Sequence, residues 1–339
     1  MIIIFRCNAG PTVGLGHLTR CRALAYALNQ KGQNCIMVGP QKSYMNDKDQ
    51  NLFIEWISVN KWKSSLEDSN ILIDIAERNK NAFLVLDDYR INEDYQLNLR
   101  KSGISWLQFD NHENKPLWAD IIINPMPGLS NKDFKNVIRN TNAELLLGPN
   151  YAILRPEFFK ALKTNYSEKI KNVLVTFGGG DDRGGNQFVI SSLLDNTPNY
   201  IRFVIISGST NPNNSKLRSW INSHGKGRVD LHINPKKIAK LFLTCDLAII
   251  SGGTTTYEAD CCGIPFVIIS IADNQIEQSL AWDRVGKANY LGDINNVDKN
   301  LLISSFNNLL KKKVFLEEKK TTTYDGLYKV ADLIISKKN

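Results

Sequence analysis

The chain has 339 residues, 42% of them hydrophobic and 22% charged, and a formal net charge of +8. These shares are those of a soluble globular protein, the length suits two domains, and the lack of an apolar run of about 20 residues excludes a membrane-spanning helix. The six cysteines, at positions 7, 21, 35, 245, 261 and 262, include no CxxC motif, which argues against a disulfide framework and a zinc site.

The first predicted element is a short strand of β-branched and aromatic residues at positions 2–5. Since the chain enters this strand without a cleavable signal pattern, we expect a cytoplasmic protein. A loop with Gly14 and Gly16 follows, and His17 stands at the start of a helix whose apolar residues recur at helical spacing as far as Leu28. Glycines let a backbone approach a ligand closely, and a helix start offers N–H groups to an anion.

The loop around His17 leaves two interpretations open. It lacks the third glycine of the dinucleotide-binding pattern, so it does not predict that kind of site. His17 either lies near the cap of an ordinary strand-to-helix turn or works as a proton acceptor. The second interpretation has a physical basis, because an imidazole with a pKa of about 6.5 takes up a proton near neutral pH.

Polar residues collect where successive strands of the first half end. They are Asp87 and Asp88 after residues 83–86, Asp110 and Asn111 after residues 105–109, and Asn124 after residues 121–123. Each group alone is also ordinary turn chemistry. Together they predict one polar edge, because ligands of doubly wound sheets bind at the carboxyl ends of the strands.

Turn-forming residues at 148–157 break this alternation, and the strand pattern restarts at Val173. We therefore expect an α/β protein with two Rossmann-like domains: residues 1–155, a linker at 156–172, and residues 173–339 with a basic helical tail. From Lys311 onward, eight lysines stand against four acidic residues, which is half of the net charge. We expect a solvated helix face here, with weak contact to an anionic membrane surface as the alternative; the tail lacks the interleaved aromatics of a nucleic-acid platform.

The first strand of the second half, residues 173–177, ends in a segment with five glycines in eight residues. The segment begins with Gly178, Gly179 and Gly180 and leads into a helical stretch. It is either a flexible connector or a loop that wraps a ligand. Connectors of this kind are usually shorter and poorer in glycine, which favours the ligand.

A second loop, Ser251, Gly252, Gly253, Thr254 and Thr255, follows the buried strand at residues 247–250 and begins a helix. Its glycine N–H groups and hydroxyls are donors suited to a diphosphate, and no lysine follows in the spacing of a nucleotide-triphosphatase loop. Glu258 lies one turn into the helix and is either a ligand of ribose hydroxyls or a surface glutamate. Asn274 and Gln275 follow the next strand and add two amides to the same edge.

These residues resemble a known family. Two Rossmann-like halves with these loops are similar to the GT-B architecture of the bacterial lipid-II N-acetylglucosaminyltransferase, and are closer to the UDP-sugar hydrolase of the pseudaminic acid pathway. The likeness runs from about residue 2 to residue 280. Its points are Gly14-Leu15-Gly16-His17 with Arg20-Cys21, Asp88-Tyr89, residues 148–158, residues 177–181, residues 246–258 and Asn274-Gln275.

The resemblance implies hydrolysis of the C1–O bond of a UDP-linked 2,4-diacetamido-2,4,6-trideoxyhexose, with His17 as general base on water and with no metal or cofactor. It also implies that the two halves face each other across a cleft, with UDP held by the second half. Backbone near Ile233 would face uracil, Glu258 would bind ribose, and the loop at 251–255 would hold the diphosphate. Tyr89, Asn274 and Gln275 would line the sugar, beside the glycines at 14, 16 and 178–180.

Three positions depart from the family pattern: Asn8, Gly180 and Tyr257 stand where relatives tend to carry Asp, Ser and Trp. Asn8 leaves the group that orients His17 undetermined, whereas we expect the other two changes to be tolerated.

Two other functions remain open at this point. One is a glycosyltransferase of the same fold, in which an acceptor alcohol replaces water; a lipid-linked acceptor would need an exposed apolar patch, for which Trp56, Trp62 and Lys61 are a small candidate. The other is a non-catalytic nucleotide-sugar binding module, which gives His17 no role.

Overall fold

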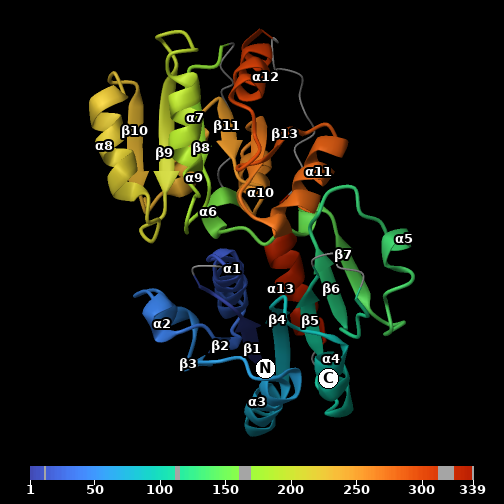
Figure 1. The fold of residues 1–339 in the computed structure, drawn as a ribbon. Helices are drawn as coiled ribbons and strands as arrows, with labels where there is room; N and C mark the ends of the chain where they lie inside the picture. Colours follow the sequence, from blue (N-terminus) through green and yellow to red (C-terminus); the bar gives the residue numbers. More distant parts are fainter. Residues whose placement is uncertain (11–12, 111–114, 160–168, 312–323, 338–339) are drawn as a thin grey trace. The chain divides into compact units, whose positions relative to one another are not determined.

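The computed structural model describes residues 1–10, 13–110, 115–159, 169–311 and 324–337 (Figure 1). The chain divides into two compact units: Met1–Arg155 with Tyr324–Asn339 form unit 1, and Pro156–Thr323 form unit 2. Each unit contains one parallel sheet flanked by helices (Figure 1). Among the described residues, no helix combines the length and the apolar character that crossing a membrane requires.

Unit 1 is built on a seven-stranded sheet in the order β3-β2-β1-β4-β5-β6-β7. The strands are β1 Ile2–Cys7, β2 Asn34–Gly39, β3 Glu55–Ser58, β4 Ala82–Asp87, β5 Trp106–Phe109, β6 Ile121–Asn124 and β7 Glu144–Leu147. The helices are α1 Gly16–Gln30, η1 Lys42–Tyr44, α2 Asp49–Leu52, α3 Ser65–Arg78, α4 Glu93–Lys101, α5 Asn131–Phe134, η2 Pro149–Tyr151 and α13 Gly326–Ser336. All pairs in the sheet are parallel, and the direction of winding reverses between β1 and β4.

Alternation along the central strands sends side chains to opposite faces of this sheet. Ile4, Leu84 and Leu86 are fully buried on the face that packs against Leu72 of α3 and Tyr95 of α4. Burying an aliphatic side chain of this size stabilises a fold by about 1.5–3 kcal/mol. Helix α1 contacts β1 and β2 instead, and the C-terminal helix α13 packs on α1.

The position of α13 differs from the expectation that residues 173–339 form one domain. Its apolar side chains, Leu327, Val330, Ala331 and Ile334, recur at helical spacing and are buried within unit 1. A side chain at Gly326 would overlap the backbone of Asn150 and Tyr151 in η2, so glycine allows the close approach. The tail is therefore not only a solvated basic face, although its residues 312–323 lie outside the described part of the chain. Periodicity predicts the apolar stripe but not the partner that covers it.

Unit 2 contains a six-stranded parallel sheet in the order β10-β9-β8-β11-β12-β13. The strands are β8 Asn172–Thr176, β9 Arg202–Ser207, β10 Val229–Ile233, β11 Leu247–Ile250, β12 Phe266–Ser270 and β13 Ala288–Asp293. The helices are α6 Pro156–Phe159, α7 Gly185–Leu193, α8 Asn214–His224, α9 Ile238–Leu243, α10 Thr255–Cys261, η3 Asp273–Gln275, α11 Ile276–Arg284 and α12 Lys299–Lys311. Of the expected linker at 156–172, the first residues form α6 of this unit, and residues 160–168 lie outside the description.

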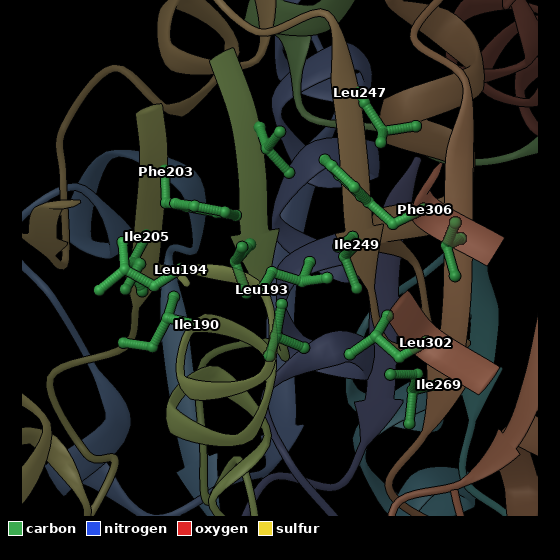
Figure 2. Close-up of a cluster of buried hydrophobic side chains, with 14 of the residues drawn as sticks. Ile190, Leu193, Leu194, Phe203, Ile205, Leu247, Ile249, Ile269, Leu302 and Phe306 are labelled. Atoms are coloured by element: carbon green, nitrogen blue, oxygen red, sulfur yellow. The ribbon is translucent and has the colours of Figure 1, made fainter. Parts of the chain in front are cut away.

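The core of unit 2 lies between the sheet and two helices. Figure 2 shows Ile190 and Leu193 of α7 and Leu302 and Phe306 of α12 in one buried cluster with Ile249 of the central strand β11. All five side chains are fully buried. This packing holds β8 and β11 in place, and the two predicted glycine loops leave the sheet at the ends of these strands.

Candidate functional site

Both sheets share one topological feature that predicts where a ligand binds. The strand order reverses between β1 and β4 in unit 1, and between β8 and β11 in unit 2. In open α/β sheets, ligands bind outside the carboxyl ends of the strands at such a switch point. Three predicted glycine loops follow β1, β8 and β11, and the predicted polar residues at 87–89 stand at the end of β4.

The loop after β1 brings His17 to the switch point of unit 1. Gly10 and Gly14 pair through two backbone hydrogen bonds, of 2.8 and 3.3 Å, which close the loop. Gly14 has φ = +77°, a backbone conformation that favours glycine. Helix α1 begins at Gly16, and His17 is 5% exposed.

His17 is held by the last residue of β4. Its Nδ1 lies 2.8 Å from the carbonyl oxygen of Asp87 and 2.9 Å from Oδ1 of the same residue. Both partners are acceptors, so Nδ1 carries a proton, and in the neutral tautomer of the ring Nε2 holds the free lone pair. The arrangement can accept a proton at Nε2 and stabilise the resulting imidazolium.

The carboxyl of Asp87 is buried and paired with Arg20, whose guanidinium donates to both oxygens. Burial by itself raises the pKa of this carboxyl, but the charge of Arg20 and then that of His17 outweigh it and hold the pKa well below its ordinary value. The guanidinium also lies 4.4 Å from the centre of the Phe109 ring. Asp87 therefore remains ionised beside His17.

Sequence analysis placed Asp87 on the polar strand edge but did not predict its contact with His17. Asn8 was the position in doubt, and its side chain accepts a hydrogen bond from the N–H of Ala9 at 2.9 Å. The acid that orients His17 comes from the neighbouring strand, where Asp87 pairs in register with Cys7. The sequence did contain a signal for this contact. Asp87 stands at the carboxyl end of the other central strand, β4, and therefore at the same sheet edge as the loop that carries His17.

Tyr89 lies beside His17. The two rings meet edge to face with centroids 4.5 Å apart, and Tyr89 is 37% exposed. Its neighbour Asp88 is ion-paired with Arg90 and Arg6. Burial raises the pKa of Asp88, but hydrogen bonds from Arg90 and the charge of Arg6 bring it below the ordinary value.

The apolar patch considered for a lipid-linked acceptor is not an open surface. Trp56 is buried and donates through its indole N–H to the carbonyl of Pro40 at 2.7 Å. Trp62 stacks on Tyr95, and the guanidinium of Arg90 lies 4.3 Å from the centre of its ring. Both indoles therefore have partners within unit 1.

The first glycine loop of unit 2 packs on the loop after β9. Gly178 has φ = +94°, and the carbonyl of Gly179 accepts from the hydroxyl of Thr210 at 2.9 Å. A side chain at Gly208 would overlap the backbone of Gly179. Part of the glycine content is thus required by contact between the two loops.

Asp182 fixes the end of this loop and had no predicted role. It is 1% exposed and accepts from the side-chain amides of Asn186 and Asn213, each at 2.7 Å, and from the N–H of Gly184 at 3.0 Å. These are neutral donors, which distinguishes Asp182 from the ion-paired Asp87. The carboxylate ties the start of α7 to the segment that begins α8.

The second glycine loop of unit 2 is held by Gln275. Oε1 of Gln275 accepts from the N–H of Gly252 at 3.2 Å and from that of Ile271 at 3.0 Å. In this conformation the N–H of Gly252 is bonded to Gln275, and its contact with phosphate stays a prediction. The contact of Gln275 with the sugar stays a prediction. Its NH₂ group would make that contact, because Oε1 is bonded to the backbone.

The other predicted residues lie along the same sheet edge. Glu258 is 6% exposed, which excludes the interpretation as an ordinary surface glutamate. Ile233 ends β10 and pairs with Ser207 of β9, and Asn274 is exposed in η3. Ser251 directly follows β11 and is buried. The residues expected to bind UDP therefore follow strands from β10 to β12, and their contacts with ligand are predictions.

Within the described ranges, no group of three or more His, Cys, Asp or Glu side chains is placed to hold a metal ion.

The two α/β units, each with a parallel sheet and loops at its switch point, define a GT-B protein. The chain matches the crystal structure of MurG from Acinetobacter baumannii with a TM-score of 0.69 and 15% identity, covering 99% of this chain and all of that one. It matches the UDP-GlcNAc 2-epimerase of Neisseria meningitidis bound to UDP-GlcNAc with a TM-score of 0.63 and 13% identity, over 99% and 100%. At these identities the matches show the fold alone.

Sequence comparison gives more specific relatives. The chain is 27% identical over 283 residues to the UDP-2,4-diacetamido-2,4,6-trideoxy-β-L-altropyranose hydrolase of Campylobacter jejuni, covering 83% of this chain and 96% of that protein. It is 28% identical over 276 residues, 79% of its length, to an uncharacterized protein of Methanocaldococcus jannaschii, of which it spans 55%. No protein-family model matches the chain. The resemblance that the motifs predicted is confirmed.

Proposed function

We propose that the protein hydrolyses the C1–O bond of a UDP-linked 2,4-diacetamido-2,4,6-trideoxyhexose, releasing UDP and the free sugar for pseudaminic acid synthesis. The likeness to the Campylobacter hydrolase supports the substrate class. The observation that carries the chemistry is the pair His17–Asp87, in which two acceptors fix the proton on Nδ1. A binding module would give no reason for an oriented, basic Nε2.

In the proposed reaction, Nε2 of His17 takes a proton from water as the water oxygen forms a bond to C1. The C1–O bond breaks, and its electron pair leaves with UDP, which is already a good leaving group. Asp87 stays ionised and stabilises the imidazolium, and Arg20 holds that carboxylate in place. A positioned base contributes about 10²–10⁴-fold to the rate.

Unit 2 would hold UDP through the loops described above. The hydroxyls of Ser251 and Thr255 and the amides of Gly253 and Thr254 would bind the diphosphate as preorganised donors. Glu258 would accept from ribose, and backbone at Ile233 would face uracil. Tyr89, Asn274 and the NH₂ group of Gln275 would line the sugar, with Gly14, Gly16, Gly178, Gly179 and Gly180 allowing close approach.

The direct test is incubation of the pure protein with the UDP-linked diacetamido sugar and no acceptor, while UDP release is followed by coupled assay. We expect rapid release of UDP and of a reducing sugar in equal amounts. Release that depends on an added acceptor alcohol would identify a transferase instead. Tight binding of the substrate without turnover under either condition would identify a binding module.

A further inference from the structure

The side chain of Gln278, in α11, donates hydrogen bonds to the second glycine loop. Its Nε2 lies 2.7 Å from the carbonyl oxygen of Gly252, 2.9 Å from that of Gly253 and 3.0 Å from the hydroxyl of Thr256. The orientation of the amide is determined by its partners, because carbonyl oxygens only accept and so must face the NH₂ group. Sequence analysis gave Gln278 no role.

The two carbonyl contacts determine where the following amides point. In a trans peptide the C=O and the N–H both lie in the peptide plane and point in opposite directions, on either side of the C–N bond. Since the carbonyls of Gly252 and Gly253 face Gln278, the N–H groups of Gly253 and Thr254 point away from it. One side chain thus aims two consecutive N–H groups in a common direction, which is how a backbone binds an anion.

Tyr257 fixes Gln278 in turn. Its hydroxyl donates to Oε1 of Gln278 at 3.1 Å, and its ring is 3% exposed and packs edge-on against Trp282, with centroids 5.4 Å apart. Trp282 donates to the hydroxyl of Thr256 at 2.9 Å, which donates to the carbonyl of Gly253 at 2.8 Å. With Oε1 bound by Tyr257, rotation of the amide by 180° would cost this bond and both carbonyl contacts.

We propose that Gln278, anchored by Tyr257, is a positioning residue that aims the N–H groups of Gly253 and Thr254 at the diphosphate of UDP. The inference rests on the proposed function, because it takes UDP to be the ligand of this loop. It also gives a role to Tyr257, one of the three positions that depart from the family pattern: the phenol hydroxyl supplies the anchor in this chain. Neither residue needs to touch substrate.

The test compares two ligands that differ in the diphosphate. Titration calorimetry measures Kd for UDP and for uridine with the wild-type protein, Gln278→Met and Tyr257→Phe. Methionine keeps the length of glutamine without its amide, and phenylalanine keeps the ring that packs on Trp282. We expect UDP binding to weaken about ten- to hundredfold for Gln278→Met and about two- to tenfold for Tyr257→Phe. Uridine binding should stay within about twofold for both.

Two matched controls belong to this experiment. Glu277→Gln changes the exposed neighbour of Gln278 on the same helix. Tyr290→Phe removes a hydroxyl that bonds Ser270 at 2.8 Å in the same unit, but not on the glycine loop. Both should bind UDP like the wild type, and thermal melting compares the folded state of all variants.

The outcomes separate this inference from the proposed function. A wild-type protein that does not bind UDP would overturn both. A wild type that binds UDP, with Gln278→Met and Tyr257→Phe binding it equally well, would overturn the positioning role alone. An equal loss of UDP and uridine affinity would also overturn it, because it would show a general distortion of the unit. If Gln278→Met does not fold, Tyr257→Phe decides the question by the same criterion.

Discussion

The switch points of the two sheets have the same topology but carry different kinds of side chain. In unit 1 the loops after β1 and β4 bring together charged and titratable groups: His17, Asp87 and Arg20. In unit 2 the loops after β8 and β11 are rich in glycine, and the loop after β11, which also carries hydroxyls, is held by the neutral amides of Gln275 and Gln278. The shared topology determines where a site forms, and the side chains determine what it does.

The two regions also differ in how they are held. Unit 1 uses a buried carboxylate with ionic partners, so its geometry depends on protonation. Asp182 of unit 2 is equally buried but has amide partners in the described structure. We therefore expect proton transfer to belong to the first region and anion binding to the second, and each prediction below tests that division.

The largest expected effect is on turnover when the base is removed. His17→Asn should lower kcat by about 10²–10⁴-fold, because no group then accepts the proton from water. The Kd for UDP should remain unchanged, since the diphosphate is assigned to unit 2. Steady-state kinetics and calorimetry measure the two quantities. His224→Asn on α8 is the matched control and should behave as the wild type. Full turnover by His17→Asn would show that the base is assigned wrongly.

The second prediction concerns the acid that orients the base. Asp87→Asn keeps the shape of the side chain but removes its charge, so the imidazolium loses its stabilising partner and Arg20 its counterion. We expect the free energy of unfolding to fall by about 3 kcal/mol. We expect kcat to fall by at most the factor of about 10²–10⁴ that the base itself contributes. Asn8→Asp serves as the comparison: it should not restore turnover to Asp87→Asn if Asp87 is the orienting group. Kinetics and urea unfolding check both effects, and normal turnover of Asp87→Asn would contradict the dyad.

A smaller effect is expected in the second region. Asp182→Asn replaces one carboxylate oxygen by an NH₂ group and so loses at least one hydrogen bond from Asn186 or Asn213. We expect a loss of about 1–3 kcal/mol in unfolding free energy and weaker UDP binding, with no change in the pH profile of turnover. Urea unfolding and calorimetry measure the first two. A changed pH profile would mean that proton transfer is not confined to unit 1.

The smallest expected effect is the change in stability with pH that Asp87 causes. The pKa of Asp87 is lower in the folded chain than its unfolded value of about 3.9. Its contribution to stability is therefore fully present above about pH 4 and is lost as the pH falls toward the folded pKa. The difference in unfolding free energy between the wild type and Asp87→Asn should shrink as the pH falls below 4. A difference that grows as the pH falls below 4 would refute the depressed pKa.

Much of the arrangement followed from local sequence patterns. The strand at 2–5, the glycine loop and the helix that starts near His17 were all predicted, because apolar alternation, glycine and helical spacing act over a few residues. The same holds for the strand and loop before Thr255. The particular fold and the likeness to UDP-sugar hydrolases also came from these motifs, and the comparisons confirmed them.

The partners of these motifs were decided by tertiary structure. His17 and Asp87 are 70 positions apart, and Tyr257 and Gln278 are 21 apart; they meet because β1 lies beside β4 and because α11 folds back over the loop after β11. Helix α13 has an apolar stripe that the sequence shows, yet only packing assigns it to α1 rather than to unit 2. Sequence by itself determined which residues can do chemistry and at which strand ends they stand. Strand order and side-chain packing decided which of them touch, since contact depends on neighbours that are distant along the chain.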